Sequence, residues 1–146
     1  AGTVLTTEQV DAAIAAGSKF LVSPGLNPKV TAYALSKGIT MLPGCSNPSD
    51  IEAALELGLK TVKFFPAEAA GGLPMLKAMS APYGAVRFMP TGGISLKNLG
   101  EYLSAKVICA CGGSYMCTAD LVDNQKWDEI IDLCKKSVEI VKEARA

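Results

Sequence analysis

Residues 61–66 have the sequence Thr61-Val62-Lys63-Phe64-Phe65-Pro66, a short apolar run that holds one lysine and ends at a proline. Similar runs recur along the chain, and each ends in residues typical of turns, mainly Gly, Pro and Ser. The six runs are Gly2–Leu5, Lys19–Val22, Ile39–Leu42, Thr61–Phe65, Val86–Met89 and Val107–Cys111. Short continuous apolar runs are typical of strands that are covered on both faces. The pattern therefore predicts six buried strands.

Segments with helix signals separate these runs. Thr6 begins a capping box with Gln9. Asn27-Pro28 and Asn47-Pro48 each place a capping residue before a proline at the first helical position. We expect helices over residues 7–16, 28–37, 48–57, 74–80 and 96–103, the last of these capped by Ser95, and a final helix that begins near Asn124. Alternation of strands and helices predicts a parallel sheet with right-handed crossovers.

Two α/β architectures fit this order, a (β/α) barrel and an open doubly wound sheet. A closed barrel has eight units and typically about 250 residues. The chain has 146 residues and six units, and is therefore about two units short of a closed barrel. We expect residues 1–146 to form a single domain.

Composition excludes several classes of protein. Lys and Arg number 14, Asp and Glu number 14, and the formal net charge is zero, which does not favour a nucleic-acid partner. The sequence has no apolar run long enough to span a membrane. It contains no histidine, which excludes Ser-His-Asp hydrolases and the usual zinc hydrolases.

The five cysteines show no paired C-x-x-C spacing. Their odd number does not favour a disulfide framework, so we expect a reducing, cytoplasmic location. Cys109 and Cys111 alternate along an expected strand, which predicts that both are small core residues.

Lys63 is the first candidate for chemistry. Burial of an ammonium group is unfavourable, so a buried lysine commonly has a lowered pKa or a charged partner. A desolvated lysine is also the nucleophile that forms Schiff bases with carbonyl substrates. The alternative interpretation is a lysine on an edge strand that reaches solvent, and the strand alone does not decide between the two.

Two glycine pairs indicate an anion site. Gly92-Gly93 follows the fifth run and Gly112-Gly113-Ser114 follows the sixth. Backbone N–H groups at such turns bind anions, and the last two βα-loops of a (β/α) barrel commonly bind phosphate. Each pair on its own is equally compatible with a tight turn. Their occurrence in consecutive loops favours a phosphate or sulfate site.

Several motifs of this sequence resemble those of one enzyme family. They are Gly2-Thr3-Val4, Ser23-Pro24-Gly25, Pro43-Gly44, Lys63-Phe64-Phe65-Pro66-Ala67-Glu68, Pro90-Thr91-Gly92-Gly93-Ile94 and Gly112-Gly113-Ser114. The family is that of the 2-keto-3-deoxy-6-phosphogluconate (KDPG) aldolases, which includes 4-hydroxy-2-oxoglutarate (KHG) aldolases. The fourth and fifth motifs are specific, and the resemblance covers the whole chain.

The resemblance implies a class I aldolase on a (β/α)8 TIM-type barrel. Such an enzyme cleaves a phosphorylated keto acid to pyruvate and glyceraldehyde 3-phosphate, with no metal or organic cofactor. Lys63 matches the Schiff-base lysine. Thr3, Pro24, Phe65 and Thr91 match residues at the pyruvate end of the pocket. Gly92, Gly93, Gly112, Gly113 and Ser114 match the phosphate loops.

The sequence also departs from the family. The family's first two βα units, which supply a general-base glutamate and two carboxylate-binding arginines, have no counterpart. We therefore expect an incomplete, six-unit barrel and strongly reduced turnover, and the alternative is a non-catalytic barrel that keeps its phosphate loops. Glu68 is the nearest carboxylate to Lys63 in sequence, and a role as a loop anchor is favoured over that of a substitute base.

An incomplete barrel exposes strand edges and interior side chains, which commonly associate with other copies. We expect a homo-oligomer, most simply a two-fold dimer, although trimers are usual in the family.

Overall fold

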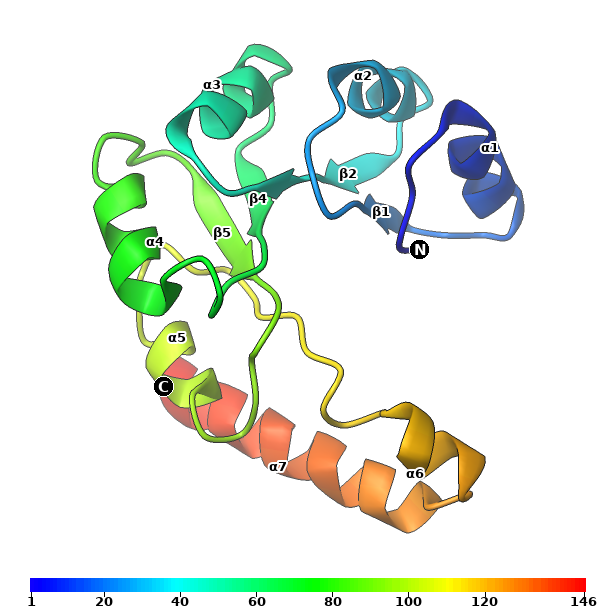
Figure 1. Cartoon of the computed structure of the whole chain (residues 1–146), viewed down its shortest axis with the longest axis vertical. Coiled ribbons are helices and arrows are strands. Elements are labelled where there is room, and N and C mark those ends of the chain that lie inside the picture. The colour runs from blue at the N-terminus through cyan, green and yellow to red at the C-terminus, as the bar shows by residue number, and fades with distance from the viewer.

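The computed structural model describes all residues, 1–146. The elements in chain order are α1 (Thr7–Ala15), β1 (Phe20–Val22), α2 (Pro28–Ser36), β2 (Thr40–Leu42), β3 (Gly44–Cys45), α3 (Pro48–Glu56), β4 (Thr61–Phe64), α4 (Gly72–Ser80), β5 (Arg87–Pro90), α5 (Leu99–Leu103), α6 (Ala119–Asp123) and α7 (Trp127–Arg145). Helices α1 to α4 lie along the outer side of an arc of strands, and α5 to α7 continue the arc (Figure 1).

All paired strands are parallel and follow the order of the chain. β1 pairs with β2, and β4 lies between β3 and β5. The two sheets are continuous through the chain because β3 begins two residues after β2 ends, and the Lys63 amide donates to the Pro43 carbonyl between them (2.9 Å). This sequential order is that expected of a barrel rather than of a doubly wound sheet.

The first and sixth apolar runs lie beside the sheet, but the prediction that they form regular strands is wrong. The first run borders β1, where the Val4 amide donates to the Val22 carbonyl (3.1 Å). The sixth run borders β5 through a single bridge from Phe88 to Ile108, and the residues just after β5 and the run form a second one, from Thr91 to Gly112. Each run has a strand partner on one side only, and these few bonds do not maintain a regular ladder.

The helices begin largely where the capping signals predict. The side chains of Thr6, Asn27 and Asn47 each accept a hydrogen bond from the first turn of the helix that follows. The inner faces of the helices cover two separate groups of core residues. Eight of them lie around β1 and β2, including Leu21 and Met41, and sixteen lie around β3 to β5, including Phe64 and Phe88. No helix combines the length and hydrophobicity that crossing a membrane requires.

The C-terminal third differs from the expectation in helix boundaries. The expected helix 96–103 is shortened to α5, which begins after Asn98. Ser95 does not cap it; the Ser95 amide donates to the Asn98 side chain instead (2.8 Å). The helix expected from near Asn124 begins at Trp127 as α7, since Gln125 just before it adopts a positive φ of 52°. The short helix α6 precedes this turn. α4 begins at Gly72, two residues before the expected start.

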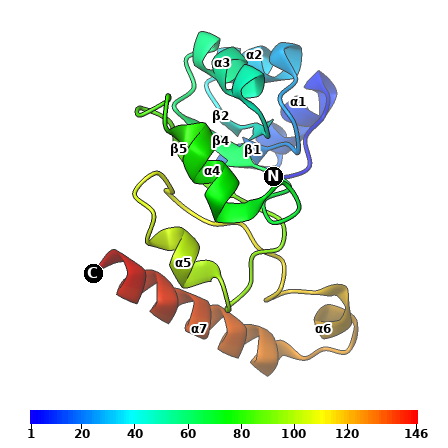
Figure 2. The ribbon, with the colours of Figure 1, turned by 60° about the vertical axis from the view of Figure 1, so that its left-hand side comes forward.

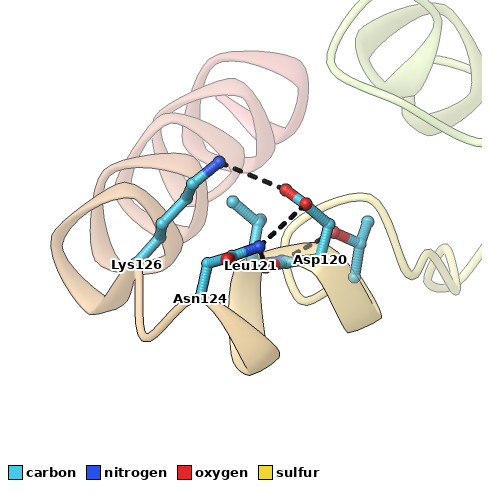
Figure 3. A network of polar contacts seen from close by, with 5 residues as sticks. Asp120, Leu121, Asn124 and Lys126 are labelled. Carbon is cyan, nitrogen blue, oxygen red and sulfur yellow. Dashed lines mark hydrogen bonds and ion pairs between the residues drawn. The ribbon is translucent and has the colours of Figure 1, made fainter.

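Polar contacts hold the turn between α6 and α7 (Figure 3). The Asn124 side-chain amide donates to the carboxylate and to the carbonyl of Asp120, each at 2.9 Å. The Lys126 ammonium contacts the same carboxylate at 3.2 Å. These contacts satisfy the end of α6 and direct the chain back along α7 (Figure 2).

The prediction that Cys109 and Cys111 are core residues is also wrong. Cys109 is exposed and Cys111 is half-buried. The reason is their position in the sixth run, which is paired only with β5. All five cysteines are free thiols.

Gly44 is required by a close backbone approach. A Cβ atom built on Gly44 would lie 1.8 Å from the carbonyl oxygen of Pro24. Both contacting groups are backbone, so rotation of a side chain cannot relieve the clash. This contact brings the loop after β1 against the start of β3, and so joins the two parts of the sheet.

We expect Gly44→Ala to lower the free energy of unfolding by about 2–3 kcal/mol, because one backbone segment must move. Gly84→Ala is the matched control, since a Cβ there meets no atom within 4 Å. It should change the free energy by no more than about 0.5 kcal/mol. Urea denaturation measures both values. Equal effects of the two substitutions would contradict this account of Gly44.

Candidate functional site

The carboxyl ends of β4 and β5 meet the loop that follows the sixth run. The Ala67 amide donates to the Thr91 carbonyl (2.8 Å), and the Gly112 amide donates to the Pro90 carbonyl (2.9 Å). Parallel strands place these ends on the same rim of the sheet. The two glycine turns that the sequence singles out are therefore neighbours.

A pocket of about 430 Å³ opens at this rim. Seven of the residues predicted from the sequence line it: Phe65, Thr91, Gly92, Gly93, Gly112, Gly113 and Ser114. Its volume lies within the range of small-molecule sites.

Lys63 lies beside this pocket, on the middle strand β4. Its register partners are Gly44 on β3 and Met89 on β5, and it is only 8% exposed. The alternative of an edge-strand lysine is therefore wrong. The ammonium lies 4.3 Å from the centre of the Phe65 ring, which forms part of the pocket wall.

Burial lowers the pKa of Lys63 below its ordinary value. No carboxylate lies within ion-pair distance of the ammonium to oppose this shift. A lowered pKa raises the fraction of neutral amine, which is the form that attacks a carbonyl carbon. The environment of Lys63 therefore suits nucleophilic chemistry.

The glycine turns present backbone donors without partners in the chain. The amides of Gly93, Ile94, Gly113 and Ser114 make no hydrogen bond within the protein. Gly92 and Gly93 adopt positive φ angles of 97° and 80°, which favour glycine. Four unpaired N–H groups around one pocket can bind an anion without any basic side chain.

Two predicted residues lie outside this pocket. Pro24 lines a different cavity, of about 340 Å³, near Leu26 and Met41. Its carbonyl contacts the Gly44 position, one strand away from Lys63. Thr3 is exposed and lines neither cavity.

Four further residues of the pocket wall were missed by the sequence reasoning. Phe20 and Val22 come from β1, and Met89 and Ile94 flank the Thr91 turn. Phe20 and Val22 are two residues apart, and alternation along a strand places such residues on one face. That signal was available, but it does not reveal which later strand the face meets.

Glu68 serves as an anchor, in agreement with the favoured interpretation. Its carboxylate accepts a hydrogen bond from the Tyr102 hydroxyl, and both residues line a separate cavity with Gly72 and Pro74. Its backbone amide donates to the Gly92 carbonyl (3.1 Å). Glu68 thus connects α5 to the glycine turn and lies outside the lining of the pocket beside Lys63.

Comparison with known proteins identifies the family. The family described as KDPG and KHG aldolase matches residues 1–133. A 2-dehydro-3-deoxy-phosphogluconate aldolase from Treponema pallidum (strain Nichols) is 48% identical over 141 residues, which are 97% of this chain and 67% of that protein. The chain belongs to the KDPG and KHG aldolase family. This confirms the family and the class I lyase function predicted from the sequence.

Two solved aldolases of the family share the fold. One is the KDPG aldolase of Legionella pneumophila, solved with pyruvate captured as a covalent carbinolamine. It has a TM-score of 0.87 and 40% sequence identity, and the match covers 91% of this chain and 65% of the Legionella chain. The enzyme of Zymomonas mobilis ZM4 with 3-phosphoglycerate has a TM-score of 0.85 and 40% identity, over 93% and 64% of the two chains. The architecture is thus of the TIM-barrel type, and the chain spans about two thirds of the length of its relatives.

The depressed pKa of Lys63 predicts a pH-dependent stability. Between the folded pKa and the ordinary value, the unfolded chain binds the extra proton, so stability rises with pH in that window. We expect Lys63→Met to raise the free energy of unfolding at about pH 7, and this gain to shrink towards about pH 10.

Urea denaturation at the two pH values measures the effect. Lys60→Met, at an exposed lysine just before β4, is the control and should show no such pH-dependent gain. A gain for Lys63→Met that is independent of pH would show that packing, and not the buried charge, is responsible.

Proposed function

We propose that this chain carries out the Schiff-base chemistry of a KDPG aldolase, with Lys63 as the nucleophile. The observation that supports this most directly is the buried Lys63 side chain on the middle strand, whose ammonium has no acidic partner. It lies beside a pocket whose rim bears free backbone donors. The relatives carry the names of enzymes that act on 2-dehydro-3-deoxy-phosphogluconate. The same phosphorylated keto acid is therefore the proposed substrate.

The proposed reaction begins with the neutral amine of Lys63. Its lone pair forms a bond to the keto carbon, which gives a carbinolamine, and loss of water gives the iminium. The hydroxyl on the carbon beyond the breaking bond loses its proton to a water molecule, and the iminium accepts the electron pair of the breaking carbon–carbon bond. Glyceraldehyde 3-phosphate then leaves as the aldehyde, and an enamine remains. Protonation of the enamine carbon and addition of water then release pyruvate and regenerate the amine.

The pocket has two proposed ends. Thr91 and Phe65 are assigned to the pyruvate end, because the Phe65 ring contacts the ammonium. We assign Pro24 and Thr3 to this end by family resemblance alone. The phosphate end is formed by Gly92, Gly93, Gly112, Gly113 and Ser114, as the four unpaired amides of this region suggest. The structure of the Zymomonas enzyme with 3-phosphoglycerate shows that a relative takes up a phosphorylated ligand.

We further propose that residues 1–146 act as one six-unit, incomplete barrel that associates with a second copy. The five free thiols are compatible with a reducing cytoplasm. α7 contains no buried residue. An apolar stripe of Trp127, Ile131 and Val138 lies on one face of this helix, and each side chain is about half exposed. This stripe is the proposed contact between copies.

Trapping with pyruvate and borohydride tests the Schiff base. We expect reduction to fix one pyruvate on Lys63, identified by peptide mass spectrometry, because the lowered pKa supplies neutral amine. Lys63→Ala should abolish the adduct, whereas Lys60→Ala should retain it. A chain that gives no adduct would favour the non-catalytic alternative, and an adduct that persists in Lys63→Ala would assign the nucleophile elsewhere.

The contact between copies is tested by charge. Ile131→Glu combined with Val138→Glu places two carboxylates in the apolar stripe, and we expect the oligomer to dissociate to monomers in sedimentation velocity. Glu143→Lys, on the same helix but outside the stripe, should leave the sedimentation coefficient unchanged. A wild-type chain that sediments as a monomer at tens of micromolar would contradict the proposal.

A further inference from the structure

Both carbonyl groups of the Gly92-Gly93 turn are held by the protein. The Gly92 carbonyl accepts from the Glu68 amide, and the Gly93 carbonyl accepts from the Asn98 side-chain amide, each at 3.1 Å. The side-chain oxygen of Asn98 accepts a hydrogen bond from the Ser95 amide at 2.8 Å. Asn98 is thereby held with its NH₂ group towards Gly93.

Holding these carbonyls determines where two N–H groups point. The Gly92 carbonyl shares a peptide plane with the Gly93 amide, and the Gly93 carbonyl shares one with the Ile94 amide. Both peptides are trans, and in a trans peptide the N–H points opposite to the C=O. The Gly93 and Ile94 amides therefore point away from the anchors; neither has an acceptor in the chain, and both residues line the pocket.

One helix supplies both anchors. Asn98 precedes the first residue of α5, and Tyr102 lies four residues later on the same face. The Tyr102 hydroxyl donates to the Glu68 carboxylate, and the Glu68 backbone amide holds the Gly92 carbonyl. Tyr102 is only 2% exposed, so the surrounding core fixes the position of its hydroxyl next to the exposed Glu68 side chain.

The fit between Glu68 and the turn is tight. A Cβ atom on Gly93 would lie 2.6 Å from the Cβ of Glu68, so only glycine fits against this side chain. The Tyr102 hydrogen bond also holds the Glu68 carboxylate in a cavity separate from the proposed phosphate end. A carboxylate released from this bond would be free to approach and repel an anion.

We propose that Tyr102, Glu68 and Asn98 are positioning residues that aim the Gly93 and Ile94 amides at the phosphate of the substrate. This inference rests on the proposed function and deepens it, because it assigns phosphate recognition to the α5 side of the turn. It predicts that loss of an anchor weakens phosphate binding more than it slows Schiff-base formation at Lys63.

The test uses inorganic phosphate as the probe, titrated into ¹⁵N-labelled protein and followed by NMR. We expect phosphate to shift the Gly93 and Ile94 amide signals of the wild type. Tyr102→Phe and Asn98→Ala should each weaken phosphate binding by about fivefold, the effect of one lost hydrogen bond. Glu68→Gln should rescue binding relative to Glu68→Ala, because the amide oxygen still accepts from Tyr102.

Tyr83→Phe is the matched control. Tyr83 donates to Glu52 at 2.9 Å in a similar pair, outside the residues that line the pocket. It should leave phosphate affinity unchanged, and pyruvate trapping at Lys63 is measured on every variant. The inference would be overturned if Tyr102→Phe and Asn98→Ala both bound phosphate as tightly as the wild type. It would also be overturned if Tyr83→Phe lost as much phosphate affinity as they do. A wild type that binds no phosphate would also overturn it, while pyruvate trapping separately decides the Schiff-base proposal.

Discussion

The parallel pairing of β4 with a strand on each side is the interaction on which the rest of the site depends. It holds Lys63 between Gly44 and Met89, where the side chain is only 8% exposed and the ammonium has no carboxylate within ion-pair distance. The free energy lost by desolvating the ammonium lowers its pKa. The same property that makes the lysine unfavourable for stability makes it suitable as a nucleophile.

The same pairing also determines where the loops meet. Because β4 and β5 run in one direction, the loops that follow them lie at one rim, and bonds from Ala67 and Gly112 to the β5 end connect them. A ligand at this rim therefore meets backbone donors that come from segments about twenty residues apart, Gly92-Gly93 and Gly112-Gly113. Recognition by backbone amides also explains how an uncharged rim without histidine or nearby arginine can suit an anion.

The two groups of core residues show that the arc is assembled from two packed parts. The residues around β1 and β2 are packed separately from those around β3 to β5, and the backbone approach of Pro24 to Gly44 joins them. At the other end of the arc, α7 packs against α5 but buries none of its own residues. The most deeply buried strand residues therefore lie at the middle strands, where the site lies, and exposed apolar side chains remain on the C-terminal helix.

Local sequence determined much of this protein. The capping residues Thr6, Asn27 and Asn47 set three helix starts, because a cap depends only on neighbours along the chain. The lysine within an apolar run and the two glycine pairs identified the candidate site for the same reason. Tertiary structure decided the rest: whether β4 is central, that the first and sixth runs have a strand on one side only, and that Phe20 and Val22 reach the pocket. It also gave Glu68 its anchoring partner, since Tyr102 lies 34 residues away and no local pattern records a contact over that separation.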